Sequence, residues 1–375
     1  MEPAPKAAAA GTVRSGQRSI YAPVTDFLLL GGGSLLILPL FALVPESRAP
    51  LVLQISFFLS FVINYPHFAH SYQIFYRDFG NKLRGRGYAP GLSYRYWFAG
   101  LAVPAVIVGL FAFFIATRNK EALGLSAGAM GFFVGWHYVK QGYGMLIVDS
   151  VFRKGFFDEV EKRIFRINAY ACWIYFFLRA NQGLRERDYL GLKYYFLDVP
   201  RPLLAIGLLV MIASTLAALW AAVRAARRNG RLKIPFNGYV AYLASLYIWL
   251  GVVFIPAIVY MIPAFHSLQY LAIVWKYEFN RERQKIAVLE AKPSADTIWI
   301  RFATFVGSGV LLGAAGFYFV PNLLDSGIGY DRTIFGSQLF TFMIFIFINI
   351  HHYFLDNVMW RKDNPDVRRH LFGAA

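Results

Sequence analysis

Long apolar runs, separated by short polar segments rich in Lys and Arg, follow one another along this 375-residue chain. Most runs approach or exceed the length of about 20 residues that an α-helix needs to cross a hydrocarbon core of about 30 Å. We therefore predict an all-α fold, a polytopic membrane helix bundle of about ten transmembrane helices. They are expected at Asp26–Leu43, Leu51–Tyr76, Tyr96–Ala116, Leu123–Val148, Ile167–Ala180, Pro202–Ala226, Phe236–Val259, Pro263–Phe279, Thr297–Phe319 and Phe335–Trp360.

The basic residues predict how this bundle lies in the membrane. On the ten-helix count, most Lys and Arg of the connecting segments fall on the side that holds both termini, which is the cytoplasm by the positive-inside rule. We accordingly divide the chain into a disordered cytoplasmic tail (1–23), a transmembrane helical domain (24–360) and a cytoplasmic tail (361–375). Ser150–Arg166 is expected to form an amphipathic helix on the cytoplasmic face. Gly183–Val199 is expected to form an interfacial helix or a plain loop on the outer side.

Composition agrees with a membrane location and narrows the partners. Aromatic residues make up 18% of the chain and charged residues only 16%, whereas soluble domains carry about 25% charged residues. The net charge of +17 could suggest nucleic acid, but the basic residues flank apolar runs, so the expected partner is the lipid bilayer and no nucleic acid. The single cysteine, Cys172, allows no disulfide within the chain and no thiolate metal cluster. We expect a multi-pass protein of a bacterial-type inner membrane or another cell membrane.

Histidine is the residue type that points to chemistry. Six of the seven histidines lie in apolar runs, and they are His67, His70, His137, His266, His351 and His352. The four runs that carry them are all predicted to cross from the outer side to the cytoplasm, so their depths can be compared. His67, His266 and His351 each precede a basic residue by ten positions, which places them about 15 Å from the cytoplasmic edge, with His137 deeper. The sequence therefore predicts that four helices offer imidazoles to one layer.

Polar side chains one helical turn beyond these histidines are candidates to support such a site, because an imidazole that binds a metal usually donates its second N–H to a neighbouring oxygen. The candidate cofactor-binding residues are Gln73, Gln141 and Gln269. The candidate catalytic residues are Lys140, Tyr270 and Asp356. Lys140 is expected to be an ion-pair partner of Asp356, a substrate anchor or a snorkelling side chain, and Tyr270 a phenol donor. Asp356 is expected to support the metal ligands rather than to bind the metal itself. Since His351 and His352 point about 100° apart on a helix, only one of them is expected to be a ligand.

All six buried histidines are candidate metal ligands. A donor set rich in imidazole and poor in carboxylate suits Fe, Zn or Cu better than Mg or Ca, and we expect iron. Any one histidine could instead be a buried residue bonded to a neighbouring helix, but six on four co-oriented helices favour a shared site. Two other functions remain open. One is a b-type haem protein that passes electrons through axial histidines, and the other is a proton-coupled transporter in which His, Lys140 and Asp356 form a relay.

At His67–His70, His137, His266 and His351–His352 the chain resembles the histidine-rich integral-membrane non-haem iron enzymes. These include lipid desaturases and hydroxylases and the bacterial membrane carotene-cleaving oxygenases. Where desaturases carry HxxxH and HxxHH boxes, this chain has the sequence HFAH and an isolated HH pair. The resemblance implies iron held by imidazoles near the membrane, activation of O2, a lipid or isoprenoid-like apolar substrate, and a possible electron donor. It thus implies a metal-dependent membrane oxidoreductase or oxygenase.

Overall fold

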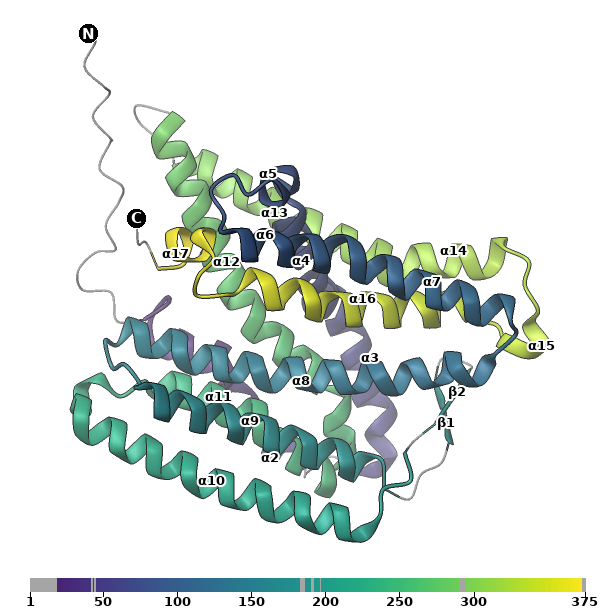
Figure 1. The fold of residues 1–375 in the computed structure, drawn as a ribbon, viewed down its shortest axis with the longest axis horizontal. Coiled ribbons are helices and arrows are strands. Elements are labelled where there is room, and N and C mark those ends of the chain that lie inside the picture. Colours follow the sequence, from purple (N-terminus) through teal and green to yellow (C-terminus); the bar gives the residue numbers. More distant parts are fainter. Residues whose placement is uncertain are drawn as a thin grey trace.

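The computed structural model describes residues 19–41, 43, 45–182, 186–189, 192–195, 197–289 and 295–372. Almost all of these residues are helical, as the apolar runs predict. In Figure 1, α8, α9 and α10 lie side by side along one part of the bundle, and α16 runs along the opposite flank of α8. Helix α12 crosses the bundle from one side to the other. Residues 1–18, most of the predicted N-terminal tail, are outside the described part of the chain.

The elements of the first half of the chain are α1 Pro23–Phe27, η1 Leu28–Gly32, α2 Gly33–Phe41, η2 Glu46–Arg48, α3 Ala49–Leu59, η3 Ser60–Asn64, α4 Tyr65–Tyr76, α5 Phe79–Leu83, α6 Pro90–Trp97, η4 Phe98–Ala102, α7 Val103–Ala116, α8 Lys120–Phe152 and α9 Glu159–Ala180. Those of the second half are β1 Glu186–Tyr189, β2 Leu192–Tyr195, α10 Arg201–Asn229, η5 Arg231–Lys233, α11 Phe236–Phe254, η6 Pro256–Tyr260, α12 Ile262–Leu289, α13 Ala295–Ala314, η7 Ala315–Phe319, α14 Val320–Gly327, α15 Arg332–Phe335, α16 Leu339–Met359 and α17 Pro365–His370.

Within the described residues, eight helices are long and apolar enough to cross a membrane, which fits a multi-pass membrane protein. They are Pro23–Phe41, Pro50–Tyr76, Pro90–Ala116, Arg201–Asn229, Phe236–Phe254, Pro256–Ala287, Asp296–Gly327 and Leu339–Met359. Helices α8 and α9 occupy the fourth and fifth predicted spans but fall outside this set. The prediction of an all-α membrane bundle is therefore confirmed, whereas the count of ten, the domain division and the cytoplasmic side of the termini stay predictions.

Two connecting segments differ from their predictions. Ser150–Arg166 is not one amphipathic helix, because α8 continues to Phe152 and α9 begins at Glu159. The start of α9 is fixed by a capping box: Asp158 accepts from the Glu161 backbone N–H at 2.8 Å, and the Glu161 carboxylate accepts from the Asp158 N–H at 2.9 Å. In the segment Gly183–Val199, the described residues form neither the expected interfacial helix nor a plain loop. Its described residues pair as the antiparallel hairpin β1–β2.

Close packing of α13 on α4 helps to place the first histidines. Two glycines of α13, Gly309 and Gly313, are spaced as in a GxxxG motif, which lets helix backbones approach in membranes. A Cβ atom added at Gly313 would lie 2.6 Å from the carbonyl carbon of Tyr65, and one at Gly309 would lie 2.2 Å from Cε1 of His70. Since Cβ atoms do not approach backbone so closely, only glycine at residue 313 permits this crossing.

Helix η1 contains a kink at Gly31, whose φ is 154°, and three π-helical turns, η3, η4 and η7, interrupt the helices elsewhere among the described residues. Such turns are rare and are often found at functional sites. The π turn η4 and the kinked segment η1 offer backbone carbonyls to side chains of other helices, because Ala99 O in η4 accepts from His351 Nε2 at 2.9 Å and Leu30 O in η1 accepts from Gln269 Nε2. These two segments therefore lie against helices that carry predicted site residues.

Candidate metal centre

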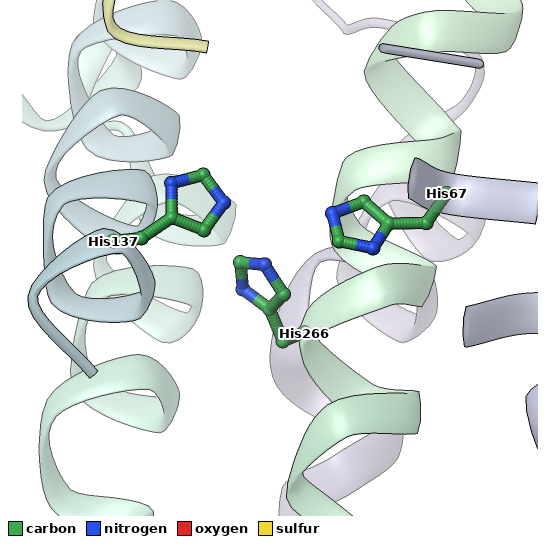
Figure 2. A group of neighbouring side chains, drawn as sticks. All are labelled: His67, His137 and His266. Carbon is green, nitrogen blue, oxygen red and sulfur yellow. The ribbon is translucent and has the colours of Figure 1, made fainter. Parts of the chain in front are cut away.

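Four of the six predicted histidine ligands meet in the interior of the bundle. His67 on α4, His137 on α8, His266 on α12 and His352 on α16 are each at most 8% exposed. The His67 and His352 rings lie 4.4 Å apart between centroids, and the His137 ring lies 4.8 Å from each of the His266 and His352 rings. Figure 2 shows three of these imidazoles reaching from three helices toward one common space. The predicted convergence of four helices on one imidazole cluster is therefore present in the structure.

The tightest group consists of His137, His352 and Asp356. The two Nε2 atoms are 3.2 Å apart, and Asp356 Oδ2 lies 3.6 Å from His137 Nε2 and 3.5 Å from His352 Nε2. Ligand atoms that share one metal at about 2.1 Å lie roughly 3.0–3.5 Å from one another. Two imidazole nitrogens and one carboxylate oxygen, all buried, thus have the spacing of ligand atoms that share one cation.

Asp356 is oriented by hydrogen bonds to only one of its two oxygens. Oδ1 accepts from the Tyr270 hydroxyl at 2.9 Å, and Ser71 Oγ, which is 2.5 Å from the same hydroxyl, lies 3.2 Å from Oδ1. Oδ2 faces the two imidazoles and has no hydrogen-bond partner among the described residues. Outer partners of this kind fix the orientation of a ligating carboxylate. The arrangement therefore leaves Oδ2 as the oxygen that is available to a metal.

The hydrogen bonds of His67 define which of its nitrogens carries the proton. Ser267 Oγ donates to Asn64 Oδ1 at 2.8 Å, and it lies 3.2 Å from His67 Nδ1. Because the single Ser267 proton is used on Asn64, the Ser267 oxygen accepts from His67 Nδ1–H. His67 Nε2 is then the unprotonated atom, it is buried, and no described residue hydrogen-bonds to it. This is the tautomer that a metal ligand requires.

His266 completes the group on the α12 side. Its ring stacks on Tyr138 with centroids 3.7 Å apart and an interplanar angle of 14°. Within the described chain, its Nε2 is buried without a hydrogen-bond partner. Ligand atoms of His67, His137 and His266 lie within 4.8 Å of one another. His137 belongs to both groups, so the two groups form one continuous centre.

The other two predicted ligands point elsewhere. His351 donates from Nε2 to Ala99 O at 2.9 Å, so its Nδ1 accepts from the Tyr72 hydroxyl at 2.8 Å, and both nitrogens are in use. His70 stacks on Phe305 at 4.3 Å and bonds from Nδ1 to Gln73 Oε1 at 2.7 Å. The structure thus separates His352, which faces the cluster, from its neighbour His351, which holds α16 against η4.

The three predicted glutamines act at some distance from the imidazole nitrogens of the cluster. Gln73 bonds to His70 and donates to Ser308 Oγ at 2.8 Å. Gln141 donates to the backbone carbonyl of His266 at 3.0 Å and to Gln269 Oε1 at 3.1 Å. Gln141 and Gln269 therefore link α8 to α12 by hydrogen bonds. The bond from Gln141 to the His266 carbonyl positions His266 through its backbone.

The predicted catalytic residues are divided between the centre and its border. Tyr270 lies at the centre, because its hydroxyl donates a hydrogen bond to Asp356. Lys140 donates from Nζ to Asn357 Oδ1, and its ammonium lies 5.8 Å from the centre of the Tyr353 ring. Lys140 is therefore paired with the amide next to Asp356 and not with the Asp356 carboxylate itself.

Sequence reasoning did not identify four supporting residues, namely Asn64, Ser71, Ser267 and Trp360. Ser71 lies one helical turn after His67, and Ser267 follows His266 directly. Trp360 Nε1 donates to the Tyr270 hydroxyl at 3.2 Å, which leaves the phenol proton for Asp356. Small polar residues beside an intramembrane histidine are a usable signal, but the partner of each lies on another helix and is visible only in the fold.

Comparison with known proteins identifies no relative: no family profile, no curated protein and no solved structure matches this sequence.

Proposed function

We propose that this chain is an integral-membrane metalloenzyme with a non-haem iron centre at His137, His352 and Asp356, completed by His67 and His266. In this proposal it is an oxygenase or related oxidoreductase of a bacterial-type inner or other cell membrane. Its substrate is a lipid or isoprenoid-like apolar molecule, and a separate donor supplies electrons. The observation that carries the proposal is the triangle of two imidazole nitrogens and one carboxylate oxygen at 3.2–3.6 Å, in which Asp356 Oδ2 has no hydrogen-bond partner among the described residues.

The donor set favours iron. Two histidines and one carboxylate are the usual ligands of non-haem Fe(II) oxygenases, which keep coordination positions open for reactants. When bound, the iron would supply the redox chemistry and the activation of O2. The protein's own residues have separate tasks: Tyr270 and Ser71 orient Asp356, and Ser267 fixes the His67 tautomer. The rings of Phe68 and Tyr138 pack against the imidazoles and exclude water.

The alternatives have less support. Axial histidines of a haem stand on opposite faces of a flat macrocycle, whereas the His137 and His352 rings meet edge to face with their Nε2 atoms 3.2 Å apart. A proton relay through Lys140 and Asp356 has no direct contact between the two groups to support it, because Lys140 Nζ donates to Asn357 Oδ1. The contacts therefore favour a metal held directly by side chains.

The adjacent histidines of α16 provide a matched test. His352→Ala should lose the bound metal, because it removes a ligand nitrogen from the tightest group. His351→Ala should keep the metal and lower thermal stability, because it removes hydrogen bonds to Ala99 and Tyr72, each contributing about 0.5–1.5 kcal/mol. Metal content measured by mass spectrometry and melting in detergent would distinguish them. Equal metal content in the two variants would refute the proposal, and reductant-dependent O2 consumption by the iron-loaded protein would test its oxygenase part.

A further inference from the structure

An apolar groove lies on the surface of the bundle, on the membrane-spanning helix Pro50–Tyr76 that also carries His67. It has a volume of about 680 Å³ and is lined by six residues between Ile55 and Val62 and by Tyr318. The side chains of Phe58 and Val62 are 69% and 57% exposed. The lining comes from two of the membrane-spanning helices, Pro50–Tyr76 and Asp296–Gly327. In a membrane this surface faces the hydrocarbon of the bilayer.

Both walls of the groove contain π-helical turns. Phe61 and Val62 belong to η3, and Tyr318 belongs to η7. Turns of this type are uncommon and occur frequently at functional sites. His67 follows η3 by three residues, so the same distortion of the helix borders the groove and leads into the first histidine ligand. The backbone of this helix thus connects the groove with the candidate metal centre.

A continuous series of aromatic rings connects the groove with the histidine cluster. Phe61 contacts Tyr65 with centroids 5.1 Å apart, and Tyr65 stacks on Phe317 at 4.7 Å with an interplanar angle of 4°. Phe317 contacts Phe68 at 4.9 Å, and Phe68 contacts His352 at 4.8 Å. This series of ring contacts runs from the groove lining to a candidate metal ligand.

The chemistry of the lining selects the occupant. Ile, Leu, Val and Phe side chains offer no hydrogen bond and no charge, so a polar or charged ligand would lose its own solvation without compensation. A hydrocarbon chain gains dispersion contacts along such a surface, and the volume lies in the range of about 300–1,000 Å³ of ligand sites. We propose that the groove receives the hydrocarbon chain of a membrane lipid and directs it past Tyr65 and Phe317 toward the metal centre. This inference rests on the proposed function and specifies its substrate class as a lipid that enters sideways from the bilayer.

Photo-crosslinking in lipid nanodiscs tests the groove. The probe is a phosphatidylcholine with a diazirine on one acyl chain, and labelled residues are mapped by mass spectrometry. We expect labelling concentrated in the segment that holds Ile55–Val62, with further labelling at Phe68. Val62→Trp should fill the groove and reduce this labelling at least fivefold. The matched control Leu53→Trp, at a 50% exposed position of the same helix outside the groove, should leave labelling unchanged.

The outcomes separate this inference from the proposed function. Both variants should keep the wild-type metal content, because neither residue touches the histidine cluster. Labelling spread evenly over other lipid-facing residues, such as Leu209 and Leu216 of α10, would overturn the groove, as would equal labelling of the two variants. Absence of metal from the wild-type protein would instead overturn the proposed function, whatever the labelling pattern. Groove labelling that never reaches Phe68 in metal-loaded protein would overturn the route to the centre.

Discussion

The hydroxyl of Tyr270 provides a sharp test of how the candidate centre is built. It donates to Asp356 Oδ1 at 2.9 Å, on the far side of the carboxylate from the two imidazoles. Tyr270→Phe deletes this donor and leaves the ring and its packing in place. Ser71 remains as a donor to the same oxygen at 3.2 Å. We therefore expect a carboxylate that is still present but less well aligned with His137 and His352.

The size of the effect follows from the bond that is lost. A hydrogen bond to a charged group contributes about 1.5–3 kcal/mol, and about 1.4 kcal/mol corresponds to a factor of ten in an equilibrium constant. Tyr270→Phe should accordingly raise the dissociation constant of the metal about 10- to 100-fold, which matches the usual cost of removing an outer partner of a metal ligand. Metal binding should be weakened and not abolished, because the ligand atoms themselves remain.

Competition between the detergent-purified protein and a chromogenic chelator of known affinity measures this change. Tyr72→Phe is the matched control, because its hydroxyl also bonds to a histidine, His351, which lies outside the cluster. The control should bind metal within about twofold of the wild type, below the effect expected of an outer partner. Unchanged affinity in Tyr270→Phe, or an equal loss in Tyr72→Phe, would refute the assignment of Asp356 as a ligand that Tyr270 orients.

Two further predictions concern the fold. Gly313→Ala should lower the melting temperature, because its Cβ would meet the backbone of Tyr65 and overpacking costs about 1–3 kcal/mol. The control Gly307→Ala on the same helix meets nothing within 4 Å and should be neutral or stabilising. The reverse order of melting temperatures would contradict this packing. His370 Nδ1 lies 2.8 Å from Gln284 Oε1, and burial lowers the pKa of His370 to about 4 from its ordinary 6.5. Because the undocked imidazole then binds more protons than the docked one between these values, docking of α17 on α12 should weaken as pH falls from 6.5 to 4. Hydrogen exchange of α17, corrected for intrinsic rates, should rise in this window in the wild type and much less in His370→Asn, and equal profiles would contradict the assignment.

Much of the fold could be predicted from the sequence because apolar length decides whether a helix can span a membrane. The positions of all ten predicted helices coincide with helical segments, although the ends differ. The predicted helix Pro263–Phe279, for example, continues as α12 to Leu289. The start of α9 at Glu159 was missed, because the charged residues after Asp158 suggested a surface segment, whereas Arg224 and Arg228 of α10 pair with Asp158 and Glu161.

The site was predicted as a layer of histidines. That prediction used only the depth of each histidine in the membrane, judged from its distance along the helix to the next basic residue. Depth alone does not distinguish His351 from His352, since both are 1% exposed in the structure. The difference between them comes from Ala99 and Tyr72 on distant helices, which use both nitrogens of His351. For the same reason His70 could not be separated from His67: its neighbours Phe305 and Gly309 lie on α13, far away in the sequence.

The proposed function requires that the cluster of His67, His137, His266, His352 and Asp356 holds a metal. The most direct test is the metal-to-protein ratio, measured by inductively coupled plasma mass spectrometry on wild-type protein purified without chelator. We predict about one transition-metal ion per chain, with iron the most abundant, as the two-histidine, one-carboxylate group favours. Wild-type protein that is folded and contains no transition metal, and that binds none when Fe(II) is supplied under anaerobic conditions, would contradict the claim.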